Sequence, residues 1–95
     1  MIPKQAVPTI QCDNKCTRVT EWRFSPGAAT GYHRHEYDYV IVPITSGQLK
    51  LMGPDGSTTV SELSAGVSYF RNAGVEHDVI NANDHEFSFV EVEFK

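Results

Sequence analysis

The chain is divided into short runs of β-forming residues by closely spaced turn signals, and this alternation limits the folds open to it. The strongest turn is Gly53-Pro54-Asp55-Gly56, where proline presets φ and glycine is free to adopt a positive φ. No window carries the apolar stripe of an amphipathic helix. The runs expected as strands are residues 17–24, 32–44, 48–52, 57–63, 67–70, 76–81 and 87–94. Short strands at this spacing predict an all-β antiparallel sandwich or small barrel.

Length and composition restrict the chain to one domain. It has 95 residues, of which 40% are hydrophobic, enough for one small core. Residues 1–16 contain Pro3 and Pro8 and show little periodicity, so we expect an N-terminal arm there, with a short strand at most. A single barrel domain is expected over residues 17–95. Because so small a domain is marginally stable by itself, we also expect a homodimer.

Charge and hydropathy exclude several classes of partner. The formal net charge is -4 and no basic cluster occurs, which argues against binding to nucleic acid or to an anionic membrane surface. Residues 1–10 lack the charged and apolar pattern of a signal peptide, and no apolar run approaches the roughly 18 residues of a membrane span. We therefore expect a cytoplasmic protein whose partner is a small molecule.

Two histidines at alternate positions, His33 and His35, are the main candidates for a metal site. Alternate residues of a strand point to the same face, so the two imidazoles should converge. A third histidine, His77, lies in a second glycine-containing stretch. Two imidazoles from one strand and one from another are the minimum set with which a protein holds a transition metal. Exposed strand histidines are the alternative for the pair considered by itself, and His77 favours the metal interpretation.

The spacing of these residues resembles the two sequence signatures of the cupin superfamily, whose members are double-stranded β-helix barrels with a jelly-roll-like fold. In the first signature a glycine precedes the His-x-His pair by six positions and a later glycine closes the hairpin, as Gly27 and Gly47 do here. The positions that match the second signature are Gly66, Asn72, Gly74, His77 and Asn81, with Asn72 where the family usually has proline. The resemblance covers residues 17–94 and is greatest to small single-domain bacterial cupins.

One position departs from the family pattern. Cupins usually place a glutamate ligand four or five residues after the second histidine, where this chain has Tyr39 and Val40. Strand alternation turns Glu36 and Asp38 away from the histidine face, unless a β-bulge brings Asp38 inward as a fourth ligand. The resemblance therefore implies a three-histidine site with Tyr39 beside it, where the phenol can donate a hydrogen bond to a bound ligand.

The resemblance implies one divalent transition metal bound by His33, His35 and His77. Iron, zinc, nickel and manganese are all candidates, because this ligand set does not select one of them. Three neutral imidazoles leave such an ion its positive charge and open positions for substrate. The leading interpretation is an enzyme acting on a small polar metabolite, dioxygenase-like first and an isomerase or lyase next, with Tyr39 as a catalytic residue. The alternative is a cupin that binds a small molecule without chemistry or that has a structural role.

The sequence does not decide which face of the predicted strands 17–24 and 87–94 is buried. Trp22 and Phe24 share a face and are expected in the core or in a dimer contact. Arg23 and Glu91 would point into the barrel only if the odd-numbered faces of their strands were buried. Because Trp22, Phe24 and Val90 favour the even-numbered faces, we interpret Arg23 and Glu91 as solvated charges.

The remaining polar candidates are expected to be structural or exposed. Asn81 is expected to close a turn or to bind backbone groups, and His85 to be exposed in a polar turn. Cys12 and Cys16 lack a second pair of ligands at finger-like spacing, so we expect them to be structural or incidental thiols.

Overall fold

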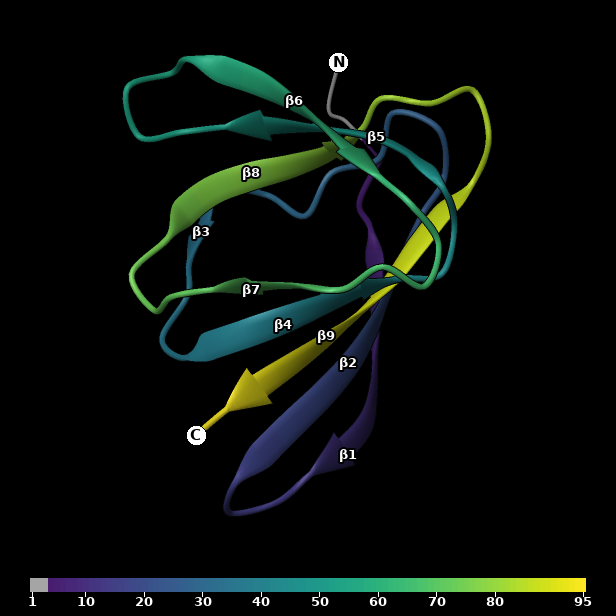
Figure 1. The fold of residues 1–95 in the computed structure, drawn as a ribbon. Helices are drawn as coiled ribbons and strands as arrows, with labels where there is room; N and C mark the ends of the chain where they lie inside the picture. Colours follow the sequence, from purple (N-terminus) through teal and green to yellow (C-terminus); the bar gives the residue numbers. More distant parts are fainter. Residues whose placement is uncertain (1–3) are drawn as a thin grey trace.

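The computed structural model describes residues 4–95, which form nine strands and no helix. The strands are β1 (Val7–Asp13), β2 (Thr17–Phe24), β3 (His33–Arg34), β4 (Asp38–Pro43), β5 (Gly47–Met52), β6 (Thr58–Leu63), β7 (Tyr69–Arg71), β8 (Glu76–Asn81) and β9 (Phe87–Phe94). A five-stranded sheet has the order β1-β2-β9-β4-β7, and a four-stranded sheet has the order β3-β8-β5-β6. Figure 1 shows them as two layers, with the four-stranded sheet above. The predicted all-β double-stranded helix is confirmed. Within residues 4–95, no helix is long and apolar enough to cross a membrane.

Most of the predicted strands are confirmed. Strands β2, β8 and β9 have the predicted bounds, while β7 begins two residues later than expected. The predicted turn between β5 and β6 is also present, since the Gly53 N–H donates to the Ser57 carbonyl at 2.9 Å and the Gly56 N–H donates to the Gly53 carbonyl at 3.1 Å. Strand β9 pairs antiparallel with both β2 and β4, so the C-terminal strand is the centre of the larger sheet.

The single strand predicted over residues 32–44 is wrong. The structure divides it into β3 and β4, which lie in different sheets, and residues 35–37 carry the chain from one sheet to the other. The division follows from the partners: β3 pairs with β8, whereas β4 pairs with β7 and β9. Asp38, at the start of β4, is exposed and accepts a hydrogen bond from the Ala73 N–H at 2.8 Å.

The segment expected as an N-terminal arm contributes an edge strand. Strand β1 pairs antiparallel with β2, with a shift of register between Ile10 and Cys12. The chain before it is also tied down, because the Ala6 N–H donates to the Ala29 carbonyl and the Ala29 N–H donates to the Lys4 carbonyl, both at 2.9 Å. Residues 1–3 of the predicted arm lie outside the described residues. Strand β1 is therefore longer than the short strand expected, and all seven of its residues are exposed.

The inward face of β9 changes from aromatic to acidic along the strand. Phe87 and Phe89 are buried in the apolar core, and Glu91 and Glu93 follow with only 8% and 5% of their surface exposed. The expectation that Glu91 is solvated is therefore wrong. The reason is the antiparallel register, in which even-numbered residues of β2 stand beside odd-numbered residues of β9, as Trp22 does beside Phe89.

The even-numbered face of β2 is buried, as the sequence indicated. Phe24 is fully buried and Trp22 packs against the core, which confirms the core assignment of both. Arg23 is exposed, and its guanidinium pairs with Glu21 at 3.2 Å and with Glu86 at 3.9 Å. The barrel thus has an apolar end around the phenylalanines and a polar end around the two glutamates of β9.

The Gly47→Ala substitution is expected to lower the free energy of unfolding by about 1–3 kcal/mol. A Cβ atom at this position would lie 2.6 Å from Asn83 Oδ1, which is closer than non-bonded atoms approach. The Asn83 side chain resists displacement, because it accepts a hydrogen bond from the Gln48 N–H and donates one to the Gln48 carbonyl, both at 2.9 Å. Urea denaturation measures the loss. Gly53→Ala is the control, since its Cβ would meet no atom closer than 3.7 Å, and equal losses in both variants would contradict the steric explanation.

Candidate metal centre

The pairing of β3 with β8 brings the two histidine-containing stretches together. His33 lies directly opposite His77 in the antiparallel register. The contact continues past the end of β3, since the His35 N–H donates to the Val75 carbonyl at 2.9 Å and the Gly74 N–H donates to the His35 carbonyl at 2.8 Å. His35 follows His33 by two residues in extended backbone, so it turns its side chain to the same face. The expected convergence of three imidazoles is present.

The three imidazoles present their Nε2 atoms to a common point. His35 Nε2 lies 3.0 Å from His33 Nε2 and 3.0 Å from His77 Nε2. The rings meet edge to face, at interplanar angles of 69°, 73° and 85°. Nitrogens bound at about 2.1 Å to one ion lie roughly 3.0–3.4 Å apart, so the two distances from His35 fit a shared metal ion. All three ligand nitrogens lie within 4.8 Å of one another. Across residues 4–95, no other group of three His, Cys, Asp or Glu side chains meets in this way.

The turn before β3 fixes the orientation of His33. Its Nδ1 lies 2.8 Å from the Gly31 carbonyl oxygen and 3.3 Å from Thr30 Oγ1. A carbonyl oxygen can only accept a hydrogen bond, so Nδ1 carries the proton and Nε2 presents its lone pair to the common point. Gly31 adopts a φ of 86°, in the left-handed region that glycine enters without strain. The Gly31 N–H also donates to Asp78 Oδ1 at 3.1 Å, which ties this turn to β8.

Burial keeps two of the three imidazoles neutral. Burial is the main cause that lowers the pKa of His35 to about 3, and the neighbouring His33 and His77 contribute in the same direction. Burial also lowers the pKa of His77 to about 4, with smaller contributions from His33 and Arg71. Only a neutral imidazole can bind a metal ion, so both side chains are in the ligand form at neutral pH.

Tyr39 reaches the histidines from the other sheet. Its ring stacks on that of His35, with ring centres 3.9 Å apart and planes 17° apart. The side chain is 2% exposed, and its hydroxyl has no hydrogen-bond partner among the described residues. Burial raises the pKa of the phenol, with the charge of Glu91 as the next cause. Tyr39 therefore places a protonated and unpaired donor beside the histidines.

Glu91 is the residue of the site that sequence reasoning missed. Its Oε2 lies 3.6 Å from His35 Nδ1, which is too long for a hydrogen bond but close enough for an electrostatic contact. Burial and, to a smaller extent, the charge of Glu93 raise the pKa of Glu91 to about 7, while Trp22 and Arg18 oppose the shift. A carboxyl group at the second nitrogen of an imidazole orients that ring for metal binding. Glu91 thus lies near the Nδ1 atom of His35, as the Gly31 carbonyl lies near the Nδ1 atom of His33.

A cavity of about 450 Å³ opens beside the histidines. Much of its wall is apolar and is formed by Ile41, Leu49, Leu51, Val79 and Phe89. At its polar end, Arg18 and Glu93 form a two-point ion pair, with Nε–Oε1 and Nη2–Oε2 distances of 2.7 and 3.0 Å. Arg71 also lines the cavity, with its guanidinium carbon 4.8 Å from the centre of the Tyr69 ring.

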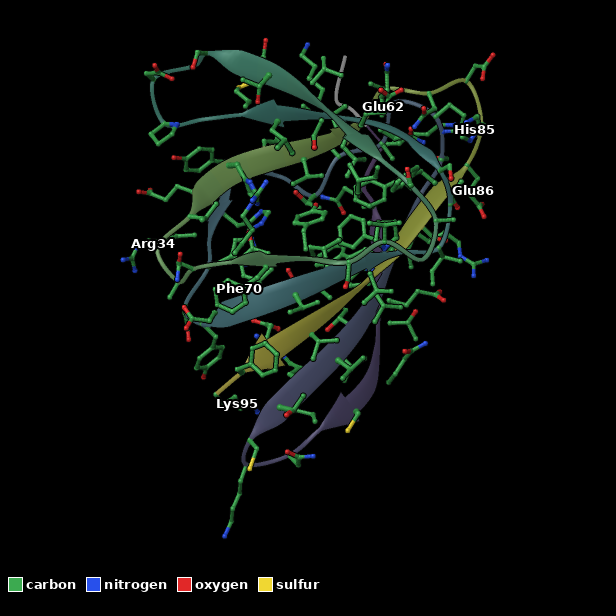
Figure 2. All side chains as sticks on the ribbon, in the orientation of Figure 1. Arg34, Glu62, Phe70, His85, Glu86 and Lys95 are labelled. Atoms are coloured by element: carbon green, nitrogen blue, oxygen red, sulfur yellow. The ribbon has the colours of Figure 1, made fainter. Side chains whose placement is uncertain are left out.

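Glu36 lines this cavity, although it was expected to turn away from the histidine face, and the remaining candidates from the sequence lie outside it. His85 is exposed in the loop before β9, on the side of the barrel away from β3 (Figure 2). Asp38 faces the turn before β8 and not the histidines. Asn81 is buried, and its Nδ2 lies within hydrogen-bond distance of three backbone carbonyl oxygens, which confirms its structural role. Cys12 and Cys16 are exposed free thiols.

The two-layered β-barrel with an imidazole cluster inside it defines a cupin, and comparison with known proteins agrees. The cupin domain model matches residues 20–93, so the chain belongs to this family. The chain is 60% identical over 91 residues to the β-alanine degradation protein BauB of Pseudomonas aeruginosa, covering 96% of this chain and 95% of that protein.

Two solved structures share this fold. A cupin domain from Bordetella pertussis Tohama I superposes with a TM-score of 0.96 at 56% identity, covering 100% of this chain and 98% of the other. The polyketide cyclase RemF from Streptomyces resistomycificus superposes with a TM-score of 0.76 at 22% identity, covering 97% of this chain and 66% of the other. The likeness to the cyclase concerns the fold only.

Proposed function

We propose that this cupin is a metal-dependent enzyme in which His33, His35 and His77 bind one divalent transition metal: iron, zinc, nickel or manganese. The observation that carries the proposal is the convergence of these imidazoles: the His35 Nε2 lies 3.0 Å from the Nε2 of each of the other two, and the three ligand nitrogens all lie within 4.8 Å of one another. When bound by three neutral imidazoles, such an ion supplies Lewis acidity and, in the case of iron, oxygen chemistry. A dioxygenase-like reaction is the leading type, and an isomerase or lyase reaction is next.

The groups of the chain itself bind and orient the substrate in this proposal. The Tyr39 hydroxyl, which is buried and unpaired among the described residues, donates a hydrogen bond to a substrate oxygen. The apolar wall around Leu49 and Phe89 excludes water from that face, and a hydrogen bond is stronger in such surroundings. Glu91 and the turn at Gly31 hold two of the imidazoles in place.

The name of one relative supports a small polar substrate. The Pseudomonas protein is called a β-alanine degradation protein, and it is 60% identical to this chain over nearly the whole length of both. The cavity of about 450 Å³ is of a size that suits a small metabolite. We therefore place the substrate among the small polar compounds of amino-acid breakdown.

Metal content and turnover test the proposal together. The protein is stripped with a chelator, reloaded separately with each of the four metals, and incubated with small amino, hydroxy and keto acids. We expect turnover with one of the metals. Oxygen uptake and product analysis are the two measurements of this turnover. Tyr39→Phe keeps the ring on His35 but removes the hydroxyl, so it should retain the metal and lower kcat by about 100-fold. His85→Ala is the control and should react at the wild-type rate.

Three results would count against parts of the proposal. Failure of the reloaded protein to retain any metal would contradict the proposal that the three histidines form a metal centre. Ligand stabilisation in a thermal-shift screen, without turnover for any metal, would favour the alternative of a cupin that binds a small molecule without chemistry. A wild-type rate for Tyr39→Phe would leave the metal centre intact and remove Tyr39 from the reaction.

A further inference from the structure

Arg71 brings an uncommitted guanidinium to the wall of the histidine cavity. We propose that Arg71 binds the carboxylate of the ligand, and that the ligand is a small carboxylate that reaches from Arg71 to the three-histidine centre. The inference rests on the proposed function, because it assigns a substrate class to the same cavity. It goes beyond that function by naming the residue that selects the ligand.

The register of the larger sheet places Arg71 beside the centre. Arg71 on β7 lies directly opposite Tyr39 on β4, and such partners project from the same face of a sheet with Cβ atoms about 5 Å apart. Tyr39 in turn stacks on His35, with 3.9 Å between ring centres. Arg71 is therefore separated from the histidine cluster by a single aromatic ring.

The surroundings of Arg71 hold the guanidinium without neutralising it. The guanidinium carbon lies 4.8 Å from the centre of the Tyr69 ring, a cation–π contact that leaves the N–H donors free. Across residues 4–95, Arg71 has no hydrogen bond and no ion pair with another side chain. The other arginines of the cavity wall differ: Arg18 is paired with Glu93, and Arg34 points away from the barrel (Figure 2).

The charge balance of the cavity favours a carboxylate over a phosphate. A guanidinium stays charged and presents paired N–H donors that match the two oxygens of a carboxylate. Glu36, Glu91 and Glu93 line the same cavity, so a phosphate would bring nearly two negative charges into a space with three carboxyl groups, of which, within residues 4–95, only Glu93 has an arginine partner. A monocarboxylate brings one charge to Arg71. A hydroxyl, keto or amino group at its other end can then reach the histidines and the Tyr39 hydroxyl.

Matched small molecules test this assignment on the metal-loaded protein. The probes are 3-hydroxypropanoate, its uncharged analogue 3-hydroxypropanamide, and inorganic phosphate, each titrated calorimetrically into zinc-loaded protein of known metal content. We expect the carboxylate to bind about 10- to 100-fold more tightly than the amide, and Arg71→Gln to abolish that preference while keeping the zinc. Arg71→Lys keeps the charge but loses the two-point geometry, so it should retain only part of the preference.

Arg23→Gln is the matched control, because Arg23 is exposed on the outer face of β2 and pairs with Glu21. It should bind all three probes as the wild-type protein does. An unchanged carboxylate preference in folded, zinc-loaded Arg71→Gln would overturn the inference and leave the proposed metal centre standing. Tighter binding of phosphate than of the carboxylate would overturn the substrate class. Failure of the wild-type protein to hold zinc would overturn the proposed function first, and the inference with it.

Discussion

Replacing His77 by alanine is expected to reduce the metal retained by the purified protein from about one ion per chain to nearly none. His77 contributes one of the three Nε2 atoms, 3.0 Å from that of His35, and the remaining two imidazoles come from a single short segment. The metal affinity should fall by more than about 100-fold, since the loss of a mere supporting contact to a ligand already costs about 10- to 100-fold. Elemental analysis measures the metal content, and competition with a chromophoric chelator measures the affinity.

His85→Ala is the matched control for this experiment, because it removes an exposed imidazole on the far side of the barrel. Its metal content should equal that of the wild-type protein. The double variant His33→Ala, His77→Ala leaves only His35 of the cluster and should bind no metal. Full metal content in the double variant would show that the ion binds elsewhere on the chain.

Replacing Asn81 by alanine is expected to lower the free energy of unfolding by about 2–4 kcal/mol. Asn81 is 2% exposed, and its Nδ2 lies 3.2, 3.2 and 2.9 Å from the carbonyl oxygens of Phe24, Ser25 and His85. Its Oδ1 accepts hydrogen bonds from the backbone and the side chain of Asn83 at 2.9 and 2.7 Å. Alanine would leave these groups unpaired at the junction of three chain segments. Urea denaturation of the metal-free protein measures the effect.

Asn72→Ala provides the comparison for the Asn81 experiment, because it removes the same side chain from an exposed turn. Its free energy of unfolding should stay within about 0.5 kcal/mol of the wild-type value. A loss for Asn81→Ala no larger than that for Asn72→Ala would contradict the structural role assigned to the buried amide.

The bounds of a strand were predictable where turn residues in the local sequence mark the same ends as the pairing with neighbouring strands. Strands β2, β8 and β9 are bounded by turn residues and have the bounds expected from sequence. The break at residues 35–37 was not predictable, because the residues on both sides are β-formers. What divides them is a choice of partners, β8 for one part and β9 for the other, which lie some 40 or more residues further along the chain.

The site was predictable as far as its histidines. The spacing of His33 and His35 sets a common face, and the resemblance to cupins supplied His77. Glu91 was missed because apolar residues occur at both odd-numbered and even-numbered positions of β9, so either face of the strand could have been the inner one. Only the pairing with β2 decides between them, and this pairing also shows why β2 and β9 bury residues of opposite parity. The homodimer and the catalytic role of Tyr39 stay predictions.

The inner face of β9 changes from aromatic to acidic along the strand. This order makes the observed alignment of β9 with its neighbours much more stable than an alignment shifted by two residues. An alternating strand can slide by two residues against its neighbours and still keep the same residues inside. In β9, such a slide would move Glu91 into the place of Phe89 beside Trp22, and would part Glu93 from Arg18, its directly opposed partner. A carboxylate forced into the phenylalanine core without a partner costs several kcal/mol, on the order of the total stability of a small domain. The same acidic residues that shape the pocket therefore discourage misaligned pairing at the centre of the sheet while the chain is folding.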